Sequence, residues 1–160
     1  MVTLDDLHNA INRGIKRAVP GLAACESYPE FTKRLPLPGV FTELSEFEPG
    51  DDPGTEQLAL IARCEARCVI DPVDDNASLY ARNLAVSVGL AVQLSRRWGL
   101  RDVGTARIVR IGEDAFRPEL DSYAVWVVQW THVIHIGQSI WTGHGITPTV
   151  VSLGDEVITP

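Results

Sequence analysis

Residues 58–70, with the sequence LALIARCEARCVI, decide the fold because apolar and charged side chains alternate along them. The apolar set occupies every second position: Leu58, Leu60, Ala62, Cys64, Ala66, Cys68 and Ile70. The intervening set includes Gln57, Arg63, Glu65 and Arg67. Alternation over this length predicts a β-strand with one buried face, since successive side chains of a strand point to opposite sides. The turn-forming pair at residues 71–72, Asp-Pro, predicts the end of the strand.

Helical patterns occur both before and after this strand in the sequence. Residues 4–18 carry apolar side chains at helical spacing, and the preceding Thr3 combines with Asp6 in a pattern similar to a capping box. A second helix is expected between residues 74–76, whose acidic and amide side chains would cap it, and Arg97 near its end. Its main apolar stripe consists of Leu79, Asn83, Val86, Leu90 and Leu94, with Leu84, Val88 and Ala91 beside it. A surface this broad predicts burial on more than one side of the helix.

The remaining regular segments are predicted strands. Their approximate limits are 22–28, 40–47, 105–111 and 123–136. The last of them is apolar on both faces, which predicts a strand that is central or covered on both sides. Short links between helix, strands, helix and strands favour an α+β fold, a mostly antiparallel mixed sheet with two main helices packed on one face. Residues 1–137 are expected to form this single domain and residues 138–160 a C-terminal extension.

Composition narrows the classes of function. The chain has 160 residues, 45% of them hydrophobic, and a formal net charge of −7. That charge argues against sequence-independent nucleic-acid binding, which rests on an excess of Lys and Arg. It does not exclude a protein that surrounds DNA without binding it. No stretch approaches the roughly 20 apolar residues that span a bilayer, and the N-terminus lacks a signal-peptide profile. We therefore expect a cytoplasmic protein without a membrane partner.

Cysteine and histidine spacing does not favour a metal site. Cys64 and Cys68 lie about 13 Å apart on a strand, whereas a disulfide needs Cα atoms within about 7 Å. We expect the three cysteines to be reduced core residues. His132 and His135 differ by three and so point to opposite faces of their strand, which leaves only His144 to join one of them. A small metal-dependent enzyme using His132 and His144 remains an alternative.

Patterns of nucleophilic or phosphate chemistry are absent from the sequence. It contains no Gly-x-Ser-x-Gly elbow and no phosphate-binding Gly-x-x-x-x-Gly-Lys loop. Four acids gather in one predicted loop and are interpreted as solvated rather than as an acid-base pair: Glu113, Asp114, Glu119 and Asp121. We expect no catalytic residue, no cofactor and no metal, and hence a protein that is not an enzyme.

Aromatic and arginine residues point instead to contacts between proteins. Three of the four tryptophans, Trp126, Trp130 and Trp141, occur in the last third of the chain. Trp and Arg are enriched in protein interfaces. The candidate interface residues are Arg63, Glu65, Arg67, Trp141, Val150 and Val151. In the alternative interpretation, the tryptophans fill the core and the charges form a solvated strand face.

The C-terminal extension, residues 138–160, is too apolar for a free tail and too interrupted by Gly and Pro to bury its own side chains. We expect it to dock on a neighbouring subunit or another partner. One way to do so is to add a strand to the edge of the partner's sheet. The competing interpretation is that it folds back over its own sheet.

Several motifs together resemble a phage family. They are Glu65-Ala66-Arg67, Arg97-Trp98-Gly99, residues 114–126 (DAFRPELDSYAVW), residues 129–132 (QWTH), Gly137 and Trp141. Over residues 40–141 the chain resembles Mu-like and related phage and prophage minor tail proteins, which are similar in fold to tail terminators.

The resemblance implies a mixed sheet flanked by helices and a ring of subunits, usually a hexamer, at the head-proximal end of the tail tube. Such a ring stops tube polymerisation and offers a surface for the neck. The implied partners are further copies of the chain, the tail tube protein and neck or head-completion proteins, with DNA passing through the lumen. The implied location is the virion tail, assembled in the host cytoplasm. A different tail or neck connector, or an adaptor protein, remains an alternative.

Overall fold

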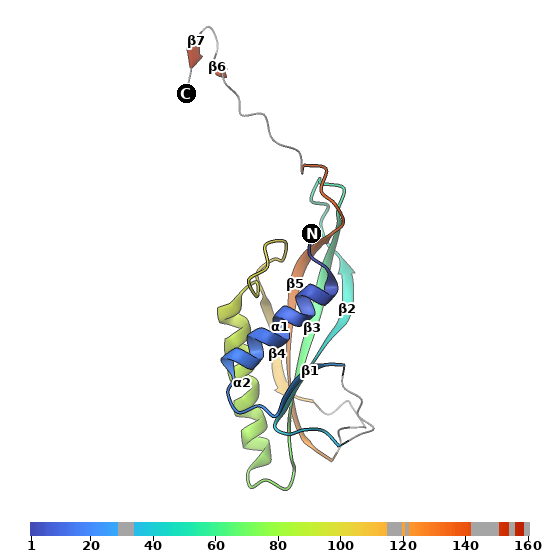
Figure 1. The fold of residues 1–160 in the computed structure, drawn as a ribbon, viewed down its shortest axis with the longest axis vertical. Coiled ribbons are helices and arrows are strands. Elements are labelled where there is room, and N and C mark those ends of the chain that lie inside the picture. Colours follow the sequence, from blue (N-terminus) through green and yellow to red (C-terminus); the bar gives the residue numbers. More distant parts are fainter. Residues whose placement is uncertain (29–33, 115–119, 121, 142–150, 154–155, 159–160) are drawn as a thin grey trace.

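The computed structural model describes residues 1–28, 34–114, 120, 122–141, 151–153 and 156–158. Figure 1 shows its helices and strands. In chain order they are α1 (Leu4–Ala18), β1 (Ala24–Ser27), β2 (Gly39–Pro49), β3 (Leu58–Ile70), α2 (Ala77–Ser95), β4 (Arg107–Glu113), β5 (Ala124–Ile136), β6 (Val151–Leu153) and β7 (Glu156–Ile158). Neither α1 nor α2 is long and apolar enough to cross a membrane.

The main sheet has five strands in the order β1-β2-β3-β5-β4. β1 runs parallel to β2, and every other neighbouring pair is antiparallel. β3 pairs with β5 along its whole length, from Leu58 opposite Ile136 to Ile70 opposite Ala124. The alternating segment is therefore the central strand, and the predicted α+β fold with a mostly antiparallel mixed sheet is confirmed.

Both helices pack on one face of the sheet, as predicted (Figure 1). The even-numbered side chains of β3 and β5 meet the helices there, with Trp130 and Cys68 at 0% exposure. α1 contributes Leu7, Ile11 and Ile15, each at most 1% exposed. Burying each such side chain stabilises the fold by about 1.5–3 kcal/mol. This helix-facing layer is the main core.

The two helices begin differently. The capping box of α1 forms as predicted, because the Thr3 and Asp6 backbone N–H groups donate to the side chain of the other residue, at 3.0 and 3.1 Å. At α2, in contrast, Asn76 adopts a left-handed conformation with φ 61° and makes no side-chain capping bond, and the first turn contains no acid. The predicted capping of α2 by residues 74–76 is therefore wrong for Asn76.

The buried face of α2 also differs from the prediction. The helix buries small side chains: Ala81, Ala85, Val88, Gly89, Ala91 and Val92. The predicted stripe lies in solvent instead, with Leu90 57% and Leu94 72% exposed. Close packing on β4 explains the choice, because a Cβ on Gly89 would lie 2.6 Å from Cδ1 of Ile111. Only small residues let the helix lie this near the sheet.

The other face of the sheet, which we call the open face, is covered only in part. Phe41, Val69 and Val125 form a second buried cluster there with residues of neighbouring loops, including Leu35 and Leu120. Further along β5, in contrast, Val133 is 44% exposed. Cover on both sides of this strand is thus confirmed for its first half and not for its end.

The C-terminal extension starts against the main domain. The Ile140 backbone N–H donates to the Thr55 carbonyl and the Trp141 indole N–H donates to the Gly54 carbonyl, both at 3.2 Å. β6 and β7 pair with each other in a separate two-stranded sheet. Residues 142–150 lie outside the described part, so docking of the extension on a partner remains a prediction.

Candidate functional site

An ion-pair network occupies the middle of the open face. Arg67 on β3 contacts three carboxylates of its own chain: Asp114 at 2.8 Å, Glu43 at 2.8 Å and Glu65 at 2.6 Å. Glu43 and Glu65 are directly opposite each other on β2 and β3, where like charges repel. Gln129 on β5 donates a further hydrogen bond to Glu65 at 2.9 Å. The guanidinium therefore joins strands whose carboxylates would otherwise destabilise the sheet.

This network is buried. The side chains of Arg67 and Asp114 are 9% and 6% exposed, so the prediction that Asp114 is a solvated loop acid is wrong. Burial opposes the charge of Arg67, but hydrogen bonding and attraction from Glu43, followed by Glu65 and Asp114, outweigh it and raise the pKa of Arg67. Arg67 and Glu65 lie on the predicted open face, yet their charged groups bond within the chain. Their contact with a partner remains a prediction.

Arg63 forms the exposed continuation of this network. Its guanidinium lies 3.1 Å from Glu46 and 3.3 Å from Glu48 on β2, and its side chain is 34% exposed. Both carboxylates are more than half exposed. Glu46 and Glu48 are thus accessible to solvent, whereas the network around Arg67 is buried.

The sheet ends at two unequal edges. At one edge β1 pairs only with Gly39–Thr42 of β2, and the Tyr28 hydroxyl then accepts from the Leu44 N–H at 2.9 Å. Beyond that bond, Ser45–Pro49 has no neighbouring strand on its outer side among the residues with described positions. At the other edge lies β4, whose one neighbouring strand in the described part of the chain is β5. Free strand edges can template pairing with another chain.

Charge divides between these two edges. Residues 39–58, which form β2 and the following turn, contain six acids and no Lys or Arg. Residues 77–113, which run from α2 through β4, contain six Arg and two acids, Asp102 and Glu113. The chain is therefore basic toward β4 and acidic toward β2, despite its overall negative charge.

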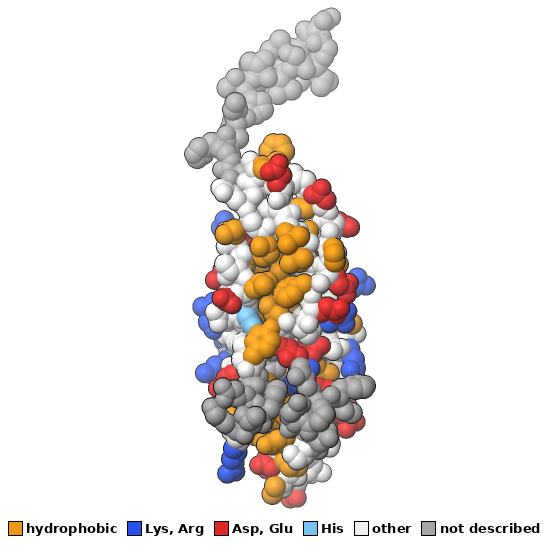
Figure 2. Space-filling model, turned by 90° about the vertical axis from the view of Figure 1, so that its right-hand side faces the viewer, with side chains coloured by type: hydrophobic (Ala, Val, Ile, Leu, Met, Phe, Trp, Pro, Cys, Tyr) orange, Lys and Arg blue, Asp and Glu red, His pale blue; other side chains and the backbone are white. Residues whose placement is uncertain are grey.

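Apolar side chains are also exposed at the acidic edge. Figure 2 views the molecule from the side on which β2 lies in Figure 1, and shows a band of hydrophobic side chains with charged groups on both flanks. On β2 itself, Phe47 is 39% exposed. The exposed part of β2 thus combines apolar and acidic side chains.

The outer side of α2 exposes a row of apolar side chains. We define the α2 stripe as Leu79, Val86, Leu90 and Leu94, which are 43–72% exposed. They recur at helical spacing and point away from the sheet. In all nineteen residues of α2 the only charged side chain is that of Arg82. Contiguous exposed apolar residues on a helix are typical of a binding surface.

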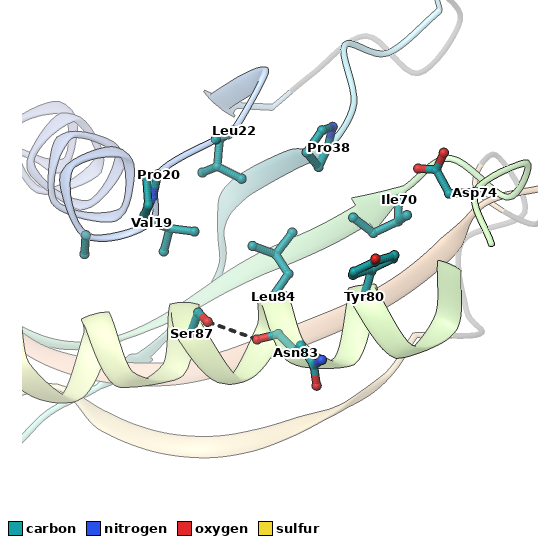
Figure 3. A pocket seen from close by; sticks show the side chains of 12 residues that line it. Val19, Pro20, Leu22, Pro38, Ile70, Asp74, Tyr80, Asn83, Leu84 and Ser87 are labelled. Carbon is teal, nitrogen blue, oxygen red and sulfur yellow. Dashed lines mark hydrogen bonds between the residues drawn. The ribbon is translucent and has the colours of Figure 1, made fainter. Parts of the chain in front are cut away.

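A groove of about 460 Å³ adjoins the α2 stripe. Figure 3 shows Val19, Pro20 and Leu22, from the segment after α1, facing Tyr80 and Leu84 of α2 across it. The groove is mainly apolar, and the Ser87 hydroxyl at its rim donates to the Asn83 carbonyl of its own helix at 3.1 Å. It is suited to receive an apolar side chain rather than to move a proton.

His132 has a structural environment. It is 1% exposed, its Nδ1 lies 2.8 Å from the Gly104 carbonyl, and its Nε2 accepts from the Trp98 indole N–H at 3.0 Å. Burial lowers the pKa of His132, opposed by the bond to Gly104. Both ring nitrogens are thus engaged by protein groups, and His144 lies outside the described residues. Over the described ranges, no group of three or more His, Cys, Asp or Glu is placed to hold a metal ion.

Two of the three cysteines lie in the core as predicted, whereas Cys25 is only half-buried. All three are free, and Cys64 and Cys68 are buried. Burial raises the pKa of Cys25 to about 11 and that of Cys64 to about 12. The pKa of Cys68 is raised by burial as well. These thiols are consequently poor nucleophiles at neutral pH.

The predicted interface residues fall in different places. Arg63, Glu65 and Arg67 share the open face, whereas Trp141 is 73% exposed near the turn at Gly54. Val150 is outside the described residues, and Val151 begins β6. Trp130 fills the core, as the alternative interpretation held, and the partly buried Trp126 packs against the core cluster. Sequence reasoning missed the exposure of the α2 stripe, although the near absence of charge on that helix was a usable signal.

Comparison of the sequence with protein-family models and with curated proteins found no match.

Proposed function

We propose that the protein is a structural subunit of a phage-type tail, a tail terminator whose ring caps the head-proximal end of the tail tube and stops its polymerisation. The observation that carries an assembly function is the α2 stripe, four large aliphatic side chains in water on a helix with one charge. The phage assignment itself rests on the resemblance of the motifs. The α+β fold agrees with what that resemblance implies.

The energetics of the α2 stripe favour a contact between proteins of some extent. Burying the exposed half of one such side chain is worth about 1 kcal/mol, so the stripe supplies roughly 4 kcal/mol. Association itself costs about 4–15 kcal/mol. The stripe can therefore contribute to an interface but needs further contacts beside it, as in a subunit that meets both copies of itself and a tube.

The charge pattern suits a ring around DNA. Two edges of opposite charge on one subunit allow a head-to-tail contact that repeats until it closes. The net charge of −7 does not favour gripping a polyanion, so DNA would pass without specific binding.

The test combines electron microscopy of the purified protein with its addition to polymerising tail tube protein of the same phage or prophage. Rings at one end of tubes of limited length are expected. Leu90→Glu should abolish tube capping, while the matched change Gln93→Glu, also exposed on α2, should not. A protein that stays monomeric at high concentration and never joins tubes would refute the proposal. Rings that bind tubes without limiting their length would indicate a connector instead.

A further inference from the structure

We infer that copies of this chain join edge to edge, with Ser45–Pro49 of β2 in one copy pairing in antiparallel fashion with β4 of the next. This inference deepens the proposed ring and rests on it for the number of copies, but the contact needs only a second copy of the chain. Both halves of the contact are strand edges without a neighbouring strand in the described structure.

Strand direction permits this pairing. β2, β3, β5 and β4 alternate in direction, so β2 and β4 are antiparallel within one sheet. Rotation about an axis along the strands preserves their directions. β4 of one copy therefore meets β2 of the next in antiparallel fashion at every step, and the sheet can continue from copy to copy.

Opposite charges meet on the open face of this pair. Glu46 pairs with Arg63 across β2 and β3, which places it on the open face, and Glu48 follows two residues later. On β4, Arg110 is opposite Gln129 and Arg107 opposite Thr131, on the same face. An antiparallel register that sets Glu46 beside Arg110 also sets Glu48 beside Arg107, because the β4 bulge makes the arginines two pairing positions apart.

Apolar side chains meet on the helix-facing side of the same register. Phe47 is opposite Ala62 and Ile108 is opposite Trp130, so both belong to that side. Phe47 is 39% exposed and would be covered by Ile108 and its neighbour Ile111, itself 37% exposed. The contact thus has an apolar side and an ionic side, like the sheet that it extends.

Charge also sets the polarity of the contact. Pairing β2 with β2 would bring Glu46 and Glu48 against the same acids, and pairing β4 with β4 would bring Arg107 and Arg110 together. Arg63 contacts both acids on β2, but its single positive charge offsets only one of their two negative charges. Like charges opposite each other destabilise a strand pair, so a symmetric dimer is disfavoured and a head-to-tail chain is favoured.

Charge exchange tests the contact in the full-length protein. Arg107→Glu with Arg110→Glu, and separately Glu46→Lys with Glu48→Lys, should each give monomers by light scattering. Mixing the two variants should restore assembly, because each altered edge then meets an edge of opposite charge. Arg97→Glu with Arg101→Glu is the matched control, equal in charge change but outside the strands, and should assemble like the wild type. Circular dichroism checks that each variant is folded.

Disulfide trapping locates the contact independently. Glu48→Cys and Arg107→Cys in one chain should yield a ladder of cross-linked copies under mild oxidation, and either change alone should yield none above the wild type. The native thiols interfere little, since burial raises the pKa of Cys25 and Cys64 to about 11 and about 12.

The outcomes separate this inference from the proposed function. If the wild type forms rings but both charge variants still assemble and no ladder appears, the edge contact is wrong and the terminator proposal stands. If the ladder and the exchange behave as expected but the assembly never caps tubes, the contact is right and the terminator proposal is wrong. A wild type that remains monomeric at high concentration and never joins tubes refutes both.

Discussion

Replacing Arg67 by methionine should destabilise the protein far more than the same change at Arg63. Both residues lie on the open face of β3, and both contact carboxylates. Arg67 is 9% exposed and holds three carboxylates, whereas Arg63 is 34% exposed between partners that are 55% and 52% exposed. The difference between the two variants therefore isolates burial and the number of partners.

The magnitude follows from the geometry. Removing one partner of a buried ion pair costs about 3–5 kcal/mol, because the remaining charges stay buried without compensation. An exposed pair is worth about 0–1 kcal/mol. For a domain of this size 1 kcal/mol lowers the melting temperature by about 2–4 °C, so Arg67→Met should lower it by roughly 6–20 °C and Arg63→Met by at most about 4 °C.

Urea unfolding followed by tryptophan fluorescence measures both variants, since Trp130 is fully buried in the native state. The slope of the unfolding free energy against urea should remain unchanged, so that a shift in midpoint reports stability alone. Equal losses in the two variants would refute the reasoning, because they would mean that the buried network around Arg67 does not form.

Three further outcomes are expected. Burial lowers the pKa of His132 below its unfolded value near 6.5, so unfolding takes up a proton and stability should fall as pH drops below about 6.5. His132→Asn should reduce the dependence of the melting temperature on pH in that range. An unchanged dependence would show that it does not come from His132. Gly14→Ala should lower the melting temperature, because the added Cβ would collide with the Trp98 ring. Gly21→Asn should lower it less, because nothing lies within 4 Å of the added Cβ and Asn tolerates the positive φ of 84° better than most residues. Truncation before Thr147 should leave the melting temperature nearly unchanged and abolish assembly, and a marked loss of the monomer's own stability would instead support folding back.

The sequence predicts those elements whose local pattern and tertiary role agree. Residues 58–70 alternate because the strand has one face under the helices and one face with charges, and this pattern survives as β3. The capping box at Thr3 is likewise a local arrangement of neighbouring residues. Both could be predicted because no distant part of the chain is needed to form them.

The failures come from contacts that local patterns do not encode. The leucines of α2 form its most hydrophobic stripe, but the helix turns its small residues inward because Ile111 on β4 leaves no room for larger ones beside Gly89. Asp114 belongs to a sequence region rich in acids, and its bond to Arg67 depends on where β4 ends relative to β3. In both cases a residue far along the chain decides the outcome.

The central position of β3 has a consequence for synthesis on the ribosome. β3 ends at Ile70 and β5 begins at Ala124, so roughly fifty residues, or about 3–10 s of translation, separate the strand from its second neighbour. During that interval β2 can pair with one side of β3, while the other side stays open to other nascent chains. Arg63, Glu65 and Arg67 place charges of alternating sign along β3 while its second side is unpaired. These charges disfavour pairing with another nascent chain in the wrong register. The side chains that form ion pairs across the finished sheet therefore also disfavour aggregation of the nascent chain.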